Sequence, residues 1–151
     1  GENGRVYLIT NASSKNMSET HFVNLGDSAS NVSGSLFSSS GEALGSPGSL
    51  PDQIAPGGRA ILSANDFEDA LGAETWEGPA LFEIENDKNF ALMTKLTSPS
   101  GLISNTNCVR ETDVHNIEGS DSPDMTYIRF INQGSSPIRN ITGNLYDHAG
   151  R

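Results

Sequence analysis

The amino-acid sequence predicts an all-β fold, a β-sandwich of short antiparallel strands with one short helix near residues 64–71. Apolar and polar residues alternate in short runs, which is the period of a strand with one face in the core. Gly, Pro, Ser and Asn gather between these runs, where tight turns are expected. Hydrophobic residues make up 34% of the 151 residues, enough for the thin core of one domain, with or without part of another.

The strand pattern is clearest at residues 90–96, where a phenylalanine and two leucines share one face and a lysine lies on the other. By the same criterion we expect strands at 5–10, 20–25, 31–38, 58–62, 79–86, 89–97, 101–107, 126–132 and 140–147. Gly34 indicates a bulge or a closely crossing strand. Residues 38–57 are rich in Ser, Gly and Pro, and we expect a connection that lies against the sandwich through its few leucine and isoleucine side chains.

The helix is predicted from its ends. Ser63 is followed three residues later by Asp66, a capping pattern at the amino end of a helix. Phe67 and Leu71 then fall on one face, as a helix packed on a core requires. Gly72 can adopt the left-handed conformation that ends many helices.

Two stretches of the sequence occur twice. Phe22–Gly26 (FVNLG) matches Phe130–Gly134 (FINQG) at an offset of 130 − 22 = 108. Asn31–Phe37 (NVSGSLF) matches Asn140–Tyr146 (NITGNLY) at an offset of 145 − 36 = 109, so one residue is inserted between the two matches. A period near 108 is the size of a small immunoglobulin-like β-sandwich and is too long for a solenoid repeat.

The period suggests a modular organisation. In this interpretation, residues 1–18 are the final strand of a preceding unit or an N-terminal strand, 19–124 are a complete sandwich unit, and 125–151 are the first two strands of a following unit. The alternative is one domain whose two halves contain similar hairpins.

A further set of residues, between 56 and 105, has the spacing of a known type of module. These residues are Pro56, Gly58, Arg59, Leu62, Ser63, Asp66, Phe67, Glu68, Leu71, Gly72, Trp76, Glu77, Gly78, Pro79, Ala80, the run Leu81 to Glu85, Leu92, Met93, Leu96, Ser98, Pro99, Gly101, Leu102 and Asn105. In these positions the chain resembles the tandem immunoglobulin-like β-sandwich repeats of large exported bacterial surface and secreted proteins. The resemblance implies a non-catalytic extracellular module and supplies no catalytic residue.

Composition excludes several classes of partner. The formal net charge is −10, and only nine Lys and Arg residues are available, so we expect no binding to nucleic acid. An acidic membrane surface would repel the chain, and no apolar run is long enough for a membrane span, so no membrane insertion is expected. The single cysteine, Cys108, excludes an internal disulfide and a cysteine-based zinc site.

The sequence contains no recognisable catalytic motif. The three histidines, His21, His115 and His148, lack the spacing of metal ligands. No nucleophile elbow, phosphate-binding loop or dinucleotide fingerprint is present, and the serines have no accompanying base. We therefore expect that the protein is not an enzyme and needs no organic cofactor.

Two ligand hypotheses remain. Glu83, Glu85 and Asp87 gather oxygen atoms around one turn and are the candidate ligands for calcium, although solvated acids are the default interpretation. Trp76 is the candidate for stacking on a glycan, with packing against Phe67 and Leu71 as the alternative.

The predicted function is that of a non-catalytic, extracellular or cell-surface, structural or adhesive module. Its expected partners are adjacent repeat units or neighbouring copies of itself, in a tandem array or a fibre assembled through strand pairing. The alternative is a glycan-binding or accessory module of a secreted hydrolase.

Overall fold

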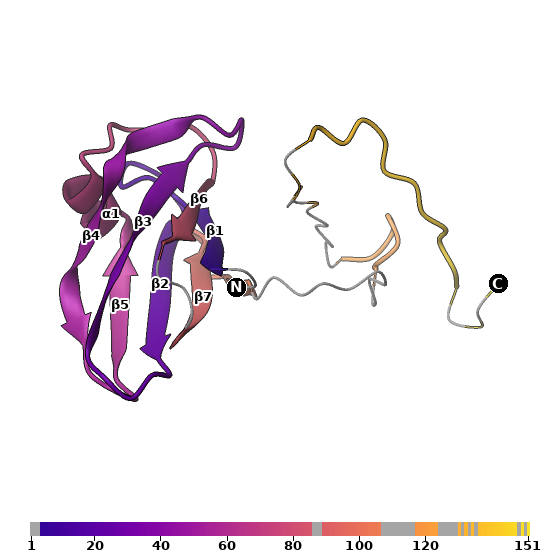
Figure 1. Cartoon of the computed structure of the whole chain (residues 1–151). Helices are drawn as coiled ribbons and strands as arrows, with labels where there is room; N and C mark the ends of the chain where they lie inside the picture. Colours follow the sequence, from indigo (N-terminus) through magenta and orange to yellow (C-terminus); the bar gives the residue numbers. More distant parts are fainter. Residues whose placement is uncertain are drawn as a thin grey trace. The chain divides into compact units, whose positions relative to one another are not determined.

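The computed structural model describes residues 4–85, 89–106, 117–123, 130, 132, 134, 136–147, 149 and 151. The chain divides into two compact units, Gly1–Arg110 and Glu111–Arg151. The first unit is built from two antiparallel β-sheets and one short helix, so the predicted all-β sandwich is confirmed (Figure 1).

Each sheet of the first unit has four strands. The strand order in one sheet is β1 (Arg5–Ile9), β6 (Ala80–Ile84), β3 (Ser30–Phe37) and β4 (Ala43–Ile54). The order in the other is β5 (Arg59–Ser63), β2 (Met17–Asn24), β7 (Phe90–Thr97) and β8 (Ile103–Thr106). All pairs of neighbouring strands are antiparallel.

The first three strands do not pair with one another. β1 pairs with β6, β2 lies between β5 and β7, and β3 lies between β4 and β6. Every hydrogen-bonded neighbour of these strands therefore comes from residues 43–97. Because a strand needs a partner to satisfy its backbone groups, β1, β2 and β3 become a sheet structure only when β4 to β7 are present.

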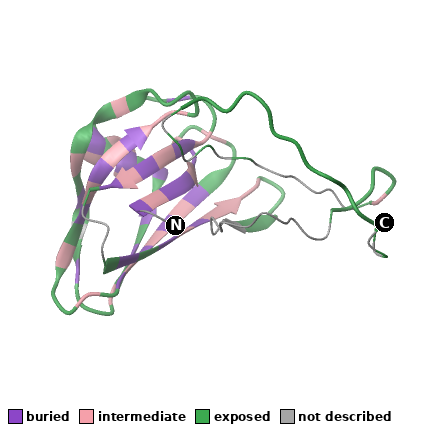
Figure 2. Ribbon diagram, turned by 45° about the vertical axis from the view of Figure 1, so that its right-hand side comes forward, coloured by how far each residue is buried: buried purple, intermediate pink, exposed green. Residues whose placement is uncertain are grey.

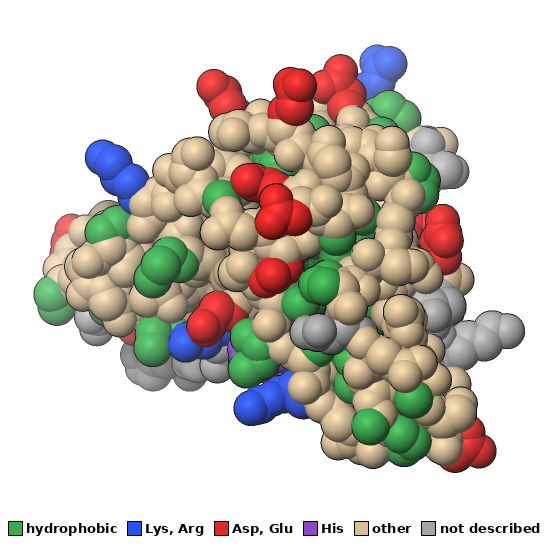
Figure 3. Space-filling view, turned by 90° about the vertical axis from the view of Figure 1, so that its left-hand side faces the viewer, with side chains coloured by type: hydrophobic (Ala, Val, Ile, Leu, Met, Phe, Trp, Pro, Cys, Tyr) green, Lys and Arg blue, Asp and Glu red, His purple; other side chains and the backbone are tan. Residues whose placement is uncertain are grey.

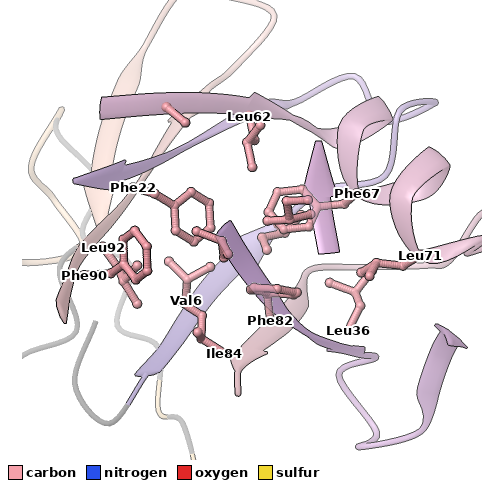
Figure 4. Close-up of a cluster of buried hydrophobic side chains, with 14 of the residues drawn as sticks. Val6, Phe22, Leu36, Leu62, Phe67, Leu71, Phe82, Ile84, Phe90 and Leu92 are labelled. Carbon is pink, nitrogen blue, oxygen red and sulfur yellow. The ribbon is translucent and has the colours of Figure 1, made fainter. Parts of the chain in front are cut away.

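The core lies between the two sheets. Buried and more exposed residues alternate along β2, β3, β6 and β7, as Figure 2 shows. At the centre Phe22, Phe67 and Phe82 form an aromatic cluster (Figure 4). The ring of Phe22 lies 6.4 Å from that of Phe67 and 6.3 Å from that of Phe82, distances at which aromatic rings attract one another.

The helix α1 (Ala64–Leu71) has the predicted ends. The Asp66 carboxylate accepts hydrogen bonds from the backbone N–H of Ser63 (2.6 Å) and from its hydroxyl (2.7 Å). Gly72 is left-handed, with φ of 59°. Phe67 and Leu71 are buried against the sheets, so the amphipathic pattern correctly identified the inward face.

Residues 38–57 were expected to be a connection, and most of them form β4 instead. β4 is an edge strand, where the missing N–H groups of Pro47 and Pro51 break no pairing inside the sheet. Gly34 marks a close crossing, as predicted: a Cβ atom there would lie 2.1 Å from the carbonyl oxygen of Glu83 on β6.

The unit boundaries differ from those expected from the sequence. Residues 5–9 pair with β6 in the same sandwich and bury Val6 and Ile9, so they are its N-terminal strand. The first unit extends to Arg110, whereas the expected unit was 19–124. Of the strand predicted at 126–132, only residues 130 and 132 are described, and the described residues 140–147 are not in a strand.

Candidate assembly surface

Trp76, the candidate for glycan binding, belongs to the hydrophobic core. Its side chain is 4% exposed and lies in the same buried cluster as Phe67 and Leu71. Its carbonyl oxygen accepts a hydrogen bond from the side-chain amide of Asn11, which ties the loop after β1 to the loop after α1. A buried indole cannot stack on a sugar, so the glycan-binding alternative loses the side chain that supported it.

The three candidate calcium ligands are not brought together as a described site. Glu83 on β6 accepts a hydrogen bond from the Arg5 guanidinium at 3.0 Å, within the register of β1 and β6. Glu85 is exposed, and its backbone N–H donates to the carbonyl oxygen of Ser33. Asp87 lies outside the described residues. Among the residues with described positions, no group of three or more His, Cys, Asp and Glu could hold a metal ion.

Charged residues lie on the surface of the first unit. On the face shown in Figure 3, acidic side chains outnumber basic ones and are spread apart. The Lys95 ammonium donates a hydrogen bond to the Glu19 carboxylate at 2.9 Å across β2 and β7, and this bond together with the lysine charge lowers the pKa of Glu19. Within the described ranges, none of the helices has the length and apolarity to cross a membrane.

Three turns of the first unit recur in the second unit with the same hydrogen bonds. The turn after β1 is closed by the Ser14 N–H, which donates to the Asn11 carbonyl oxygen at 3.1 Å. The Ser122 N–H donates to the Gly119 carbonyl oxygen at 3.0 Å, and the offset between the two serines is 122 − 14 = 108. This correspondence lies before the two stretches matched by sequence.

The second recurring turn follows β2. The Asn24 side-chain amide donates to the Ser28 carbonyl oxygen (2.8 Å), and its carbonyl oxygen accepts from the Gly26 N–H (2.8 Å). The same two bonds are made by Asn132, with the Ser136 carbonyl oxygen at 2.8 Å and the N–H of Gly134 at 2.9 Å. The offset is again 132 − 24 = 108.

The third recurring turn connects β3 to β4. The Ser38 N–H donates to the Glu42 carbonyl oxygen (2.8 Å), and the Ser38 hydroxyl accepts from the Glu42 N–H (3.2 Å). Asp147 makes the same pair of bonds with Arg151, at 3.0 Å each, through its N–H and its carboxylate. The offset is 147 − 38 = 109, as in the second sequence match.

Apolar residues before and between these turns are buried in the first unit and exposed in the second. Ile9, Phe22, Val32 and Leu36 are at most 1% exposed. Their counterparts in the second unit are Ile117 (41%), Phe130 (64%), Ile141 (59%) and Leu145 (78%). We call the latter four residues the assembly surface. Equivalent positions of the repeat are therefore buried in the first unit and exposed in the second.

The sequence itself supports a longer match than the one first identified. At the offset of 108, Val6 corresponds to Val114, Ile9 to Ile117 and Met17 to Met125. This part of the match is hard to see in the sequence because only a few scattered apolar residues are identical in the two segments. It becomes visible once the structure places β1 at the beginning of the unit.

Comparison with known proteins adds no relative: no protein-family model, curated protein or solved structure matches this chain.

Proposed function

We propose that the chain is a non-catalytic part of a tandem array of β-sandwich modules in an extracellular or cell-surface protein with a structural or adhesive role. The observation that carries this proposal is the recurrence of three turns, with matched hydrogen bonds, at the same offsets as the two sequence matches. Modules repeated in tandem are a common way to build long extracellular proteins from one stable fold.

The length of the unit supports an array over a single domain with similar hairpins. The first compact unit is Gly1–Arg110, and its length is close to the repeat offset. At the repeat offset of 108, Val114 corresponds to Val6 in β1.

The edge strands β1 and β4 of the first sheet are poorly suited to pairing with a strand of another molecule, which favours modules linked covalently in one chain. β1 carries a β-bulge between Val6 and Ile9, with Leu8 at φ of 65°. β4 contains Pro47 and Pro51 and two shifts of register against β3. Bulges and prolines on edge strands prevent the addition of a strand from another molecule.

The charge of the surface favours solubility of the proposed module. The net charge of −10 and the dispersed acidic side chains in Figure 3 keep such a module soluble and reduce non-specific association.

The test uses antibodies raised against the full chain, on intact and on lysed cells of the source organism. We expect labelling of intact cells, and loss of that labelling after protease treatment of the cell surface. Labelling that appears only after lysis would refute the extracellular role. The non-catalytic role would be refuted if the purified chain had hydrolytic activity and a surface substitution that preserves the fold removed that activity.

A further inference from the structure

We propose that His21 and Met93 form a binding site for a soft monovalent metal ion, Cu(I), on the outer face of the sheet that contains β2 and β7. The two residues are 93 − 21 = 72 positions apart in sequence and lie directly opposite each other on these neighbouring strands. Their neighbours Phe22 and Leu92 point into the core, so His21 and Met93 point outward. Opposite residues of an antiparallel pair have Cβ atoms about 4.5–5.5 Å apart, so an imidazole nitrogen and a thioether sulfur can share one ion.

The imidazole of His21 has a nitrogen atom without a partner. Its Nε2 atom is buried, and among the described residues nothing forms a hydrogen bond with it. A buried polar atom that lacks a partner costs free energy, and in a native protein such an atom requires a physical reason. A metal ion bound to Nε2 would supply the missing partner. The orphaned nitrogen is thus an observation for a ligand that does not depend on the strand register.

The two donors select the kind of ion. A thioether is a soft ligand that favours Cu(I), whereas Ca²⁺ and Mg²⁺ require clustered oxygen atoms. Zn²⁺ in proteins takes three or four side-chain ligands, and in the described part of the chain no group of three or more His, Cys, Asp and Glu could hold a metal ion. Cu(I) is soft and accepts as few as two ligands, so one histidine and one methionine are sufficient.

The surroundings of the pair are compatible with a bound cation. Ile61 of β5 lies opposite His21 on its other side, so an apolar side chain stands on each of the two neighbouring strands. Two positions along β2 and β7, Glu19 accepts a hydrogen bond from Lys95 at 2.9 Å, which balances the lysine charge beside the site. Both strands are interior strands of their sheet, and donors on such strands are held more rigidly than donors on loops.

The experiment titrates the full chain carrying Cys108→Ser with Cu(I) in the absence of oxygen. The cysteine is replaced because its thiolate would compete for the ion. The ion is supplied as its coloured complex with bicinchoninate, and the loss of colour measures transfer to the protein. We expect one Cu(I) to be transferred per chain. His21→Ala and Met93→Leu should each weaken the affinity by at least about 10-fold.

A matched control variant is available on the same strand. Met17 is 64% exposed at the start of β2, and its opposite residue on β7 is Thr97, which supplies no soft donor. Met17→Leu should therefore leave the Cu(I) affinity unchanged. Urea midpoints of all variants should equal that of the parent, because the three substituted residues lie outside the core.

The methionine methyl groups provide a readout that a merely structural role would not move. The chain has three methionines, so methyl spectra of protein labelled with ¹³C at this position contain three signals. One equivalent of Cu(I) should shift the Met93 signal and leave those of Met17 and Met125 in place. The same shift should be absent in His21→Ala.

Failure to take Cu(I) from bicinchoninate would overturn the proposed site. So would an affinity that Met93→Leu leaves unchanged, or a shift of another methionine signal in place of Met93. These outcomes are distinct from a failure of the proposed array, which the labelling of intact and lysed cells tests without any metal.

Discussion

The segments 22–42 and 130–151 contain the two matched stretches of sequence, yet among the described residues only their turns have the same hydrogen bonds. The Asn24 and Asn132 turns have nearly identical hydrogen-bond lengths. The apolar residues between the turns are buried in β3 of the first region and exposed in the second region. Turns form from residues close in sequence, whereas a strand requires a partner that the same few residues cannot provide.

The largest difference in stability effect between the two regions is expected for the matched residues Phe22 and Phe130. Phe22→Ala should destabilise the first unit by about 3–5 kcal/mol, because it removes a fully buried ring between Phe67 and Phe82. Phe130→Ala should change the free energy of unfolding by less than about 0.5 kcal/mol, since the Phe130 ring is 64% exposed. Urea denaturation of the full-length variants measures both. Similar costs for the two would mean that Phe130 is packed in solution.

Substitution of the matched residues Asn24 and Asn132 should show a smaller difference, again with the larger loss of stability in the first unit. Asn24 is fully buried and joins β2 to the Ile54 carbonyl oxygen at the end of β4. Asn24→Ala should therefore cost about 1–3 kcal/mol, because it leaves buried backbone groups without partners. Asn132→Ala should cost less than about 0.5 kcal/mol, since water can replace its bonds at an exposed site. Denaturation midpoints that shift equally would show that the Asn24 bond to Ile54 contributes little.

Much of the fold was predictable because its signals are local. The helix followed from Ser63, Asp66 and Gly72, which act within one or two turns of the chain. Most strands followed from alternation, which depends only on burying one face. The strand β4 was not predicted because its glycines and prolines are typical of turns. They are tolerated in β4 because tertiary structure places this strand at the edge of its sheet.

The candidate sites were less predictable because they depend on pairing between distant residues. Glu83 was a candidate calcium ligand until the register of β1 and β6 brought Arg5 to its carboxylate from a distant part of the sequence. The pairing of β1, β2 and β3 with later strands alone was equally hidden from the sequence. No local pattern contains that information.

The backbone of β1 at Leu8 suits the residue found at the matched position of the second region better than it suits leucine. Leu8 has φ of 65°, a conformation that costs a leucine about 1–2 kcal/mol. Asn116 stands at the corresponding position, 116 − 8 = 108, and asparagine tolerates this conformation. We expect Leu8→Asn to stabilise the first unit by about 0.5–1 kcal/mol in thermal denaturation. Leu8→Ala, which keeps the strain and loses apolar packing, should destabilise it, and a gain from Leu8→Ala would contradict the explanation.

The smallest expected effect is the pH dependence of stability that the Glu19–Lys95 ion pair gives to the first unit. Lys95 lowers the pKa of Glu19 below its ordinary value of 4.5, so the pair stabilises the fold fully above that value. The stabilisation is lost as the pH falls through the lowered pKa, because the carboxylate becomes protonated. Both side chains are partly exposed, at 47% for Glu19 and 33% for Lys95, so the contribution should be about 0.2–1 kcal/mol.

Tyr127 stands at the position of Glu19 in the second region, 127 − 19 = 108, so this pH dependence should belong to the first unit alone. The measurement is the urea midpoint of the full chain and of Glu19→Gln at pH 7 and at a pH well below the lowered pKa of Glu19. The difference between the two proteins should be largest at pH 7 and shrink at the lower pH, where neither side chain at position 19 carries a charge. A difference that persists unchanged in acid would show that Glu19 acts through packing, and that charge does not separate the two regions.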